Sequence, residues 1–319
     1  MDELKNTPLP PDEDLTEVRK PTSLLIAQFF LFPLIIIGIC LGMFLLFGYM
    51  TYDQKTAKDY VDAIRTGSGT QKWQAAFELS NLVMKDREHT HTPEFVESLS
   101  KAYTDSADED IKVRGYIARI LGEFKEHSVV PMLIEGVQRE ERLKTRDWPR
   151  DGMLSYFQPS LDQIHEELIQ AQIYTLWALG SIGDNSAVPV VLDFSKNQEA
   201  SVRKVAAYVL GVLKDERAVE QLRVLLNDPK DDVKWNAAIA LAQLHDSESA
   251  ELLMTLIDRS YVDALPDMTE DERIPLMSGA VTALGMLKYE PAKEKIRELS
   301  EKDVELKVRN AALEALKKY

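Results

Sequence analysis

The feature that most constrains the fold is a block that recurs after 31 residues in the middle of the chain. The segment from Ser201 to Leu213 aligns without a gap with the segment from Asp232 to Leu244, and both keep the frame V-x-x-x-A-A-x-x-L-x-x-L. One unit upstream, the segment beginning at Ala171 fits the same frame. Such a fixed period is typical of stacked repeats, in which each unit buries its apolar face only against its neighbours. The recurrence therefore predicts a repeat array in place of a single compact core.

The frame extends from about residue 55 to the end of the chain. Its first position falls at Gln71, Val113, Ala171, Val202, Val233, Leu276 and Val308. Where two of these positions are much farther apart than 31 residues, we expect an insertion between units, because loops tolerate added length cheaply. The frame thus predicts about seven units in residues 55–319, with insertions at about 138–164 and 259–272.

Each unit is expected to contain two helices. The apolar frame positions recur with the period of one helix face, and a shorter apolar segment such as 187–194 precedes the frame. Ser186 is placed to cap the start of that shorter helix, and Gly183 belongs to the turn before it. No alternating strand pattern of useful length occurs. The region from residue 55 onward is therefore predicted to be all-α, an α-solenoid of two-helix units.

The repeats resemble the HEAT-repeat family, in particular the short HEAT-like repeats of phycobilin lyases and many bacterial proteins. The residues that carry the resemblance are Val202-Arg203 with Ala206-Ala207 and Leu210-Gly211, Ala178 to Pro189, and Val113-Arg114 with Leu121-Gly122. The basic residue that the family places after the valine is present at Arg114, Arg203, Lys234 and Arg309. It is replaced at Gln172 and Met277. The resemblance implies the fold more strongly than a function, since such repeats serve many roles.

A long apolar segment precedes the repeats. Residues 24–50, from Leu24 to Met50, contain no charged side chain and would span roughly 40 Å as a helix, enough to cross a membrane. A cleaved signal peptide would have a shorter apolar region that ends at a small-residue site. We therefore expect a single-pass transmembrane helix that anchors the chain in the cell membrane.

Charges and prolines next to this segment suggest its orientation and its flank. Arg19 and Lys20 lie directly before it, which favours a cytoplasmic N-terminus with the repeats outside or in the periplasm. Residues 1–23 are acidic, and they carry Pro8, Pro10, Pro11 and Pro21. We expect them to form a disordered tail.

Composition and motifs argue against several classes of function. The net charge of −15 disfavours nucleic-acid binding, which needs a basic face to displace counterions. Cys40 is the only cysteine and lies in the apolar segment, so no cysteine-based zinc site is expected. The five histidines lack a zinc-protease spacing, and no phosphate-binding loop or nucleophile elbow occurs. We predict no catalytic residue, metal or cofactor, and no enzymatic activity.

A row of large side chains beside the apolar stripe is the main candidate for partner binding. The third and seventh frame positions lie on one face of each second helix. The residues proposed there are Trp73, Phe77, Arg119, Trp177, Lys204, Tyr208 and Trp235. The resemblance implies that second helices line the concave side of the array, where solenoids often bind partners. The alternative is that these aromatics pack between neighbouring units.

The first insertion supplies a second candidate surface. It contains a locally basic run with an aromatic residue, namely Arg142, Lys144, Arg146, Trp148 and Arg150. Long inserted loops in compact arrays are often functional. We interpret this run as a contact for lipid headgroups or for an acidic partner.

These observations together predict a membrane-anchored scaffold or docking protein that binds other proteins of unknown identity. One alternative is an accessory subunit of a larger membrane complex, for which Gly38-x-x-x-Gly42 would provide a helix-packing motif. Another alternative, which only the family resemblance suggests, is a chromophore-lyase-like enzyme.

Overall fold

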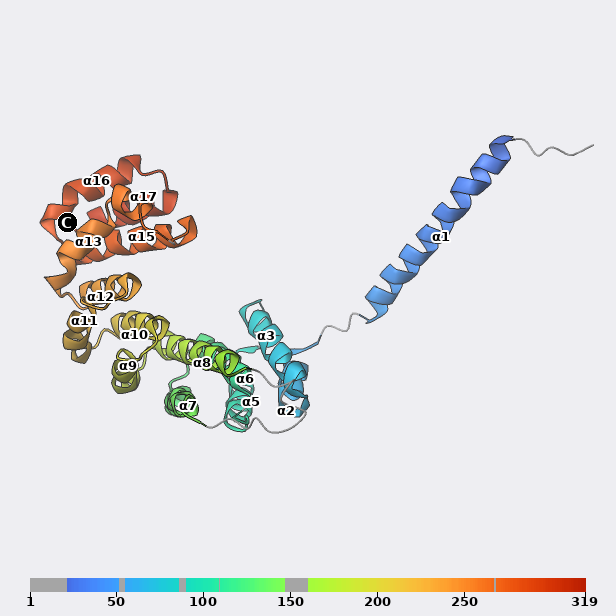
Figure 1. Ribbon diagram of the computed structural model, residues 1–319, viewed down its shortest axis with the longest axis horizontal. Coiled ribbons are helices and arrows are strands. Elements are labelled where there is room, and N and C mark those ends of the chain that lie inside the picture. The colour runs from blue at the N-terminus through green and yellow to red at the C-terminus, as the bar shows by residue number, and fades with distance from the viewer. Residues whose placement is uncertain (1–21, 52–54, 86–89, 109, 147–159, 267) are drawn as a thin grey trace, which may run out of the picture. The chain divides into compact units, whose positions relative to one another are not determined.

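The structure is a computed structural model that describes residues 22–51, 55–85, 90–108, 110–146, 160–266 and 268–319. All regular secondary structure in these residues is helical, and they contain no strand. The chain divides into two compact units, Met1–Lys55 and Thr56–Tyr319, which we describe separately (Figure 1). The predicted all-α class is confirmed.

The first unit contains helix α1 (Thr22–Thr51), which includes the predicted membrane segment from Leu24 to Met50. Among the described residues, no helix combines the length and the apolar character needed to cross a membrane. The predicted single-pass anchor and the predicted placement in the cell membrane are therefore wrong. Residues 1–21 of the predicted tail lie outside the described residues, and residues 22–23 belong to α1.

In the second unit, the helices alternate between a first and a second helix of each pair. The first helices are α2 (Ala57–Thr66), α5 (Pro93–Thr104), α7 (Val130–Leu143), α9 (Val188–Phe194), α11 (Val219–Leu225), α13 (Ala250–Leu256) and α16 (Lys293–Lys302). The second helices are α3 (Gly69–Lys85), α6 (Ile111–Phe124), α8 (Leu161–Ile182), α10 (Ala200–Leu213), α12 (Asp231–Gln243), α15 (Glu270–Leu287) and α17 (Leu306–Leu316). A short helix, α14 (Arg259–Asp263), lies between α13 and α15. In the middle of the array, α8, α10 and α12 lie on the inner side of the curve, and α7, α9 and α11 lie on its outer side (Figure 1).

The core follows the sequence frame. Val202, Ala206 and Leu210 of α10 are fully buried, as are the equivalent residues Val233 and Leu241 of α12. The buried side chains form two large clusters, one that reaches from α2 to α12 and one that reaches from α12 to α17, and a third, small cluster from α6, α7 and α8. Because α12 contributes to both large clusters, the core is a strip that passes from one pair of helices to the next, as expected for stacked repeats.

Glycine at the tenth frame position lets consecutive second helices approach closely. A Cβ atom at Gly122 of α6 would lie 2.7 Å from the Cα of Ala178 in α8. A Cβ atom at Gly211 of α10 would lie 2.8 Å from the Cα of Ala240 in α12. Both distances are shorter than a real contact permits, so any side chain here would push the helices apart.

The ends of the second helices also repeat. Left-handed backbone occurs just after five of them, at Lys125, Gly183, Lys214, His245 and Lys288. These residues share one position in the frame, which shows that the repeat fixes backbone geometry as well as burial. Of these five residues, only Gly183 is a glycine, the residue type that adopts this conformation without a steric cost.

The caps of the first helices differ in position from the prediction. Ser186 was expected to cap the shorter helix, but the Asp184 side chain accepts a hydrogen bond from the Ser186 backbone N–H at 2.8 Å. A 3-10 turn (Asn185–Ala187) separates this cap from α9, so the cap lies earlier in the sequence. Asp215 and Asp246 cap the next two turns in the same way.

Candidate functional site: an aromatic groove on the second helices

Aromatic rings from four successive second helices lie next to one another. Phe77 of α3 contacts Tyr116 of α6 edge to face, with ring centroids 5.7 Å apart. Tyr116 contacts Tyr174 of α8 at 5.6 Å. Trp177, one turn farther along α8, contacts Tyr208 of α10 at 4.5 Å. We call these five residues, Phe77, Tyr116, Tyr174, Trp177 and Tyr208, the aromatic row.

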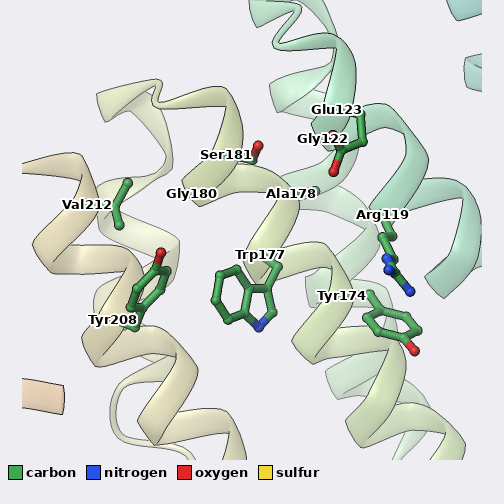
Figure 2. A pocket seen from close by; sticks show the side chains of 10 residues that line it. All are labelled: Arg119, Gly122, Glu123, Tyr174, Trp177, Ala178, Gly180, Ser181, Tyr208 and Val212. Atoms are coloured by element: carbon green, nitrogen blue, oxygen red, sulfur yellow. The ribbon is translucent and has the colours of Figure 1, made fainter. Parts of the chain in front are cut away.

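A pocket of about 470 Å³ opens beside the aromatic row. Its lining comes from α6, α8 and α10 and includes Arg119, Gly122, Glu123, Tyr174, Trp177, Ala178, Gly180, Ser181, Tyr208 and Val212. Figure 2 shows Trp177 between Tyr208 on one side and Tyr174 with Arg119 on the other. The small residues of the lining have little or no side chain, and they leave the space that the larger residues surround. The close approach of the helices and the hollow therefore have the same origin in the sequence.

The rings of the pocket remain accessible although they contact one another. Trp177 is 43% exposed and Tyr208 is 36% exposed, while Phe77 at the other end of the row is 39% exposed. Their neighbours at frame positions, such as Leu176 and Leu179, are fully buried. Exposed apolar surface of this kind is typical of interaction sites. The rings thus pack between units, as the alternative expected, and also present a free face.

Basic side chains accompany the rings. The guanidinium carbon of Arg119 lies 5.7 Å from the centroid of Tyr174, and the Lys112 ammonium lies 5.7 Å from the ring of Trp73. Lys112 also pairs with Glu167 at 2.9 Å, and Lys204 of α10 pairs with Asp232 at 3.3 Å. Cation–π contacts hold such groups over ring faces. The carboxylates that pair with both lysines, together with Glu123 in the pocket lining, balance these cations, so the aromatic row has no marked excess of positive charge.

The structure brings together some of the residues predicted from sequence and separates others. Phe77, Arg119, Trp177 and Tyr208 belong to the aromatic row or its pocket. Trp73 is partly buried against the core, where Lys112 covers its ring. Trp235 is only 6% exposed and belongs to the second core cluster. Its place in the predicted groove is therefore corrected, because α15 and α12 pack together and enclose it.

Two members of the aromatic row, Tyr116 and Tyr174, were missed by the sequence prediction. Both occupy the fourth frame position, three residues before the seventh position. Residues three apart lie on the same helix face, so the seventh-position row should have been extended to the fourth. The signal was present, since aromatic residues stand at this position in two consecutive units.

The predicted basic run in the first insertion is partly neutralised by contacts inside the chain. Arg146 pairs with Asp108 at 2.6 Å, and Arg139 pairs with the same carboxylate. Hydrogen bonding to Arg139 holds the pKa of Asp108 below its ordinary value. Lys144 pairs with Glu141 at 3.0 Å, and Arg142 is exposed. Trp148 and Arg150 lie outside the described residues.

The basic residue after the frame valine has a clear structural role. Arg203 donates to both carboxylate oxygens of Asp228 in the next unit, at 2.7 and 3.0 Å, and to two backbone carbonyls of the preceding loop. The equivalent Arg114 is fully buried, with its Nε 3.6 Å from Glu140 Oε1. Burial raises the pKa of Glu140 to about 8. These residues hold units together and do not line the pocket.

The described residues contain no group of three or more His, Cys, Asp or Glu side chains that would hold a metal ion. The chemistry that the site offers is therefore that of rings, one guanidinium, one carboxylate and a hydroxyl. Such a set can stack on extended or planar groups, and Arg119 and Glu123 can orient them by charge.

Comparison with known proteins bears on the fold. Three overlapping matches to the family described as HEAT repeats cover residues 159–242, 194–264 and 225–317. The C-terminal half of this chain consists of HEAT repeats. No curated protein matches the chain.

Several solved structures align with most of this chain. The complex of CpcE and CpcF of phycocyanin lyase from Nostoc sp. PCC7120 matches with a TM-score of 0.52 and 19% identity, covering 83% of this chain and 88% of that chain. An engineered protein matches with a TM-score of 0.39 and 17% identity, over 83% of this chain and 96% of that one. Human deoxyhypusine hydroxylase matches with a TM-score of 0.32 and 16% identity, over 82% of this chain and 95% of that one. The first likeness shows the HEAT-like fold, and the other two are too distant to carry an argument.

Proposed function

We propose that residues 56–319 form a docking array that binds a segment of another protein along the aromatic row, without catalysing a reaction. The observation that carries this proposal is that Trp177 and Tyr208 contact each other across two units and still expose more than a third of their surface beside a pocket. Solenoids use their inner surface for binding in this way. The array would serve as a scaffold that holds its partner in a fixed position along the aromatic row.

The composition of the pocket supports a protein partner. Trp, Tyr and Arg are the residues most enriched among those that dominate binding energy in interfaces, and all three line this pocket. Rigid rings lose little conformational entropy when a partner covers them, because only two side-chain torsions are fixed. A scaffold with preorganised rings therefore binds without a large ordering cost.

An accessory role within a larger complex is a variant of the same function. The similar structure from Nostoc is a complex of two chains, CpcE and CpcF, which supports the view that an array of this fold works together with another protein. Its description also names a lyase, but the likeness at 19% identity concerns the fold alone. No arrangement of the described residues favours a chromophore-lyase-like activity over docking.

The test is capture of partners by variants of the full chain. Trp177→Ala and Tyr208→Ala together should reduce the recovery of the partner from an extract of the source cells by at least about tenfold, as interface anchors do. Val224→Ala is the matched control, because Val224 is 63% exposed on the outer helix α11. Equal recovery with the double variant and the control would refute the proposal.

A further inference from the structure

The aromatic rings of the array differ in whether the chain itself supplies a cation for them. Lys112 of α6 lies over Trp73 of α3, with its ammonium 5.7 Å from the ring centroid. Arg119 of α6 lies over Tyr174 of α8, with its guanidinium carbon also 5.7 Å from the centroid. The electron-rich face of an aromatic ring attracts a cation within about 6 Å of its centroid. These two rings therefore already have the positively charged neighbour that their faces favour.

Trp177 and Tyr208 have no such neighbour. In the part of the chain that the structure describes, no lysine or arginine lies over either ring, although both side chains are exposed and line the pocket. Lys204 lies one turn before Tyr208 on α10, but its ammonium pairs with Asp232 at 3.3 Å. The two rings contact each other, so an occupant would meet the surface that each ring turns to the pocket. This surface is available for a cation from another molecule.

The pocket also contains a carboxylate without a partner. Glu123 of α6 belongs to the lining, and it forms no hydrogen bond or ion pair with any residue within the described ranges. Arg119 lies one turn before Glu123 on the same helix, but its guanidinium lies over Tyr174. Figure 2 shows this guanidinium on the side of Trp177 that faces away from Tyr208. An occupant beside the two uncovered rings would therefore find an unpaired negative charge in the same pocket.

Two rings and a carboxylate are complementary to a guanidinium group. A planar guanidinium stacks on aromatic faces and donates two parallel hydrogen bonds to one carboxylate, whereas an ammonium is a strongly hydrated point charge. The chain uses both contacts elsewhere, because Arg119 lies over Tyr174 and Arg203 donates to both carboxylate oxygens of Asp228. The net charge of −15 would also attract a basic partner over a longer range.

We infer that the pocket receives an arginine side chain of the partner protein, an inference that rests on the docking function proposed above. The guanidinium stacks on Trp177 and Tyr208 and pairs with Glu123. The partner segment is therefore basic, and arginine at one position determines its recognition. Glu123 becomes a specificity-determining residue of the docking surface.

Three fluorescein-labelled peptides of equal length test this inference by fluorescence anisotropy with the full chain. Each peptide alternates glycine and serine around three test positions, which are arginine in the first peptide, lysine in the second and glutamine in the third. The arginine peptide should bind at least about threefold more tightly than the lysine peptide of the same charge, because stacking and paired hydrogen bonds favour the guanidinium. It should bind at least about tenfold more tightly than the glutamine peptide.

Variants that change one charge each link the peptide to the pocket. Glu123→Gln should weaken the arginine peptide at least about tenfold, because it keeps the shape of the side chain and removes the charge that pairs with the guanidinium. Glu220→Gln is the matched control, since the Glu220 side chain is 85% exposed on the outer helix α11, and it should leave the affinity unchanged. Arg119→Gln should leave the affinity unchanged or raise it, because it removes a like charge from the pocket.

Thermal unfolding separates binding from folding. Glu123→Gln should unfold at the same temperature as the parent chain, because the Glu123 carboxylate has no partner among the described residues. Trp177→Ala in the same assay should remove the preference for the arginine peptide over the lysine peptide, because the stacking surface is lost.

Several results would overturn the inference. These are absence of binding of the arginine peptide, equal affinity for the arginine and lysine peptides, equal effects of Glu123→Gln and Glu220→Gln, or a loss of affinity in Arg119→Gln. If partner capture still depended on Trp177 and Tyr208 in any of these cases, the docking function would stand without the arginine. If capture did not depend on these rings either, both proposals would fail.

Discussion

Two regions of the array use the same sequence frame with different results. From α9 to α12 the 31-residue period is kept, and Arg203 pairs with Asp228 in the next unit while donating to the loop before it. Between α6 and α8 the period is broken by an insertion, and Arg114 is enclosed with Glu140 of α7 in the core. Arg203 is thus partly exposed and bridges two units, whereas the equivalent Arg114 is buried in the core.

The pocket lies where the two regions meet, because its lining comes from α6 and α8 of the irregular region and from α10 of the regular one. In the regular region the helices pack in uniform steps, with Gly211 against Ala240. At the α6–α8–α10 junction the fourth and seventh frame positions carry large rings and Arg119. The larger side chains cannot all pack flat against neighbouring units, so they remain partly exposed around a hollow. The pocket therefore depends on which residues occupy these frame positions, because the step from Ala171 to Val202 that carries Trp177 and Tyr208 keeps the 31-residue period.

The largest expected effect comes from removing the buried arginine. At about pH 9, where Glu140 is ionised in the folded chain, Arg114→Met leaves the carboxylate in the core without its cation, and we expect a loss of about 3–5 kcal/mol in the free energy of unfolding. Arg203→Met should cost only about 1.5–3 kcal/mol, as expected for charge-assisted hydrogen bonds near the surface. Denaturant unfolding measures both. Equal losses of unfolding free energy would show that the two arginines play the same role and would contradict the difference between the regions.

The next largest effect is a pH dependence of the free energy of unfolding that arises from Glu140. Burial raises the pKa of Glu140 from 4.5 to about 8, so the folded chain keeps a proton that the unfolded chain releases. Its contribution to stability is then fully present below about pH 4.5 and is lost as the pH rises toward about 8. The other ionisable groups close to it are Arg114, Arg139 and Tyr103.

Glu140→Gln should flatten the fall in stability over this pH window, as measured by urea unfolding at several pH values. Asp228→Asn is the control in the regular region, because the pKa of Asp228 is lowered by its hydrogen bonds from Arg203 and its contribution is lost toward acid. An unchanged pH profile for Glu140→Gln would contradict the raised pKa.

A third prediction concerns the close packing of a frame glycine against the next second helix, which both regions share. Gly122→Val and Gly211→Val should each destabilise the array by about 1–3 kcal/mol, because the new side chain overlaps Ala178 or Ala240 and close-packed helices cannot absorb it. Gly69→Ala is the control, since no atom lies within 4 Å of a Cβ built there. Thermal unfolding would reveal the difference. A much smaller loss at Gly122 than at Gly211 would mean that the irregular junction is loosely packed.

The smallest expected effect is stabilising. Lys214 adopts a φ of 52° after α10, a conformation that costs a side-chain-bearing residue about 1–2 kcal/mol. Lys214→Gly should therefore raise the free energy of unfolding by about 0.5–1 kcal/mol, after the greater entropy of glycine in the unfolded chain is subtracted. Lys125→Gly tests the same site in the irregular region. A loss of stability in both variants would contradict the shared capping geometry.

The sequence was sufficient for features that depend on local pattern. The frame predicted the buried face of each second helix, because Val202, Ala206 and Leu210 repeat with the helical period and are fully buried. It was insufficient where distant elements meet. Trp235 shares its frame position with Trp73, but the packing of α15 on α12 buries it. Arg146 belongs to a basic run in the sequence, and only the fold reveals Asp108 as its partner.

The predicted membrane anchor shows another limit. The apolar composition of residues 24–50 favoured a membrane span, but spanning is a property of a continuous helix with both sufficient length and apolar side chains. In the part of the chain that the structure describes, no helix is both long enough and apolar enough to cross a membrane. The aromatic row, in contrast, was partly foreseen because its seventh-position residues follow the frame, and its fourth-position residues follow by the same geometry.

Site-specific photo-crosslinking tests the central claim most directly. A crosslinking amino acid placed at position 208, on the inner helix α10, is compared with one at position 224, on the outer helix α11, in the full chain bound to its partner. The account predicts that the partner crosslinks from position 208, that it does not crosslink from position 224, and that Trp177→Ala abolishes the product. Crosslinking from position 224 alone, or equally from both positions, would contradict it.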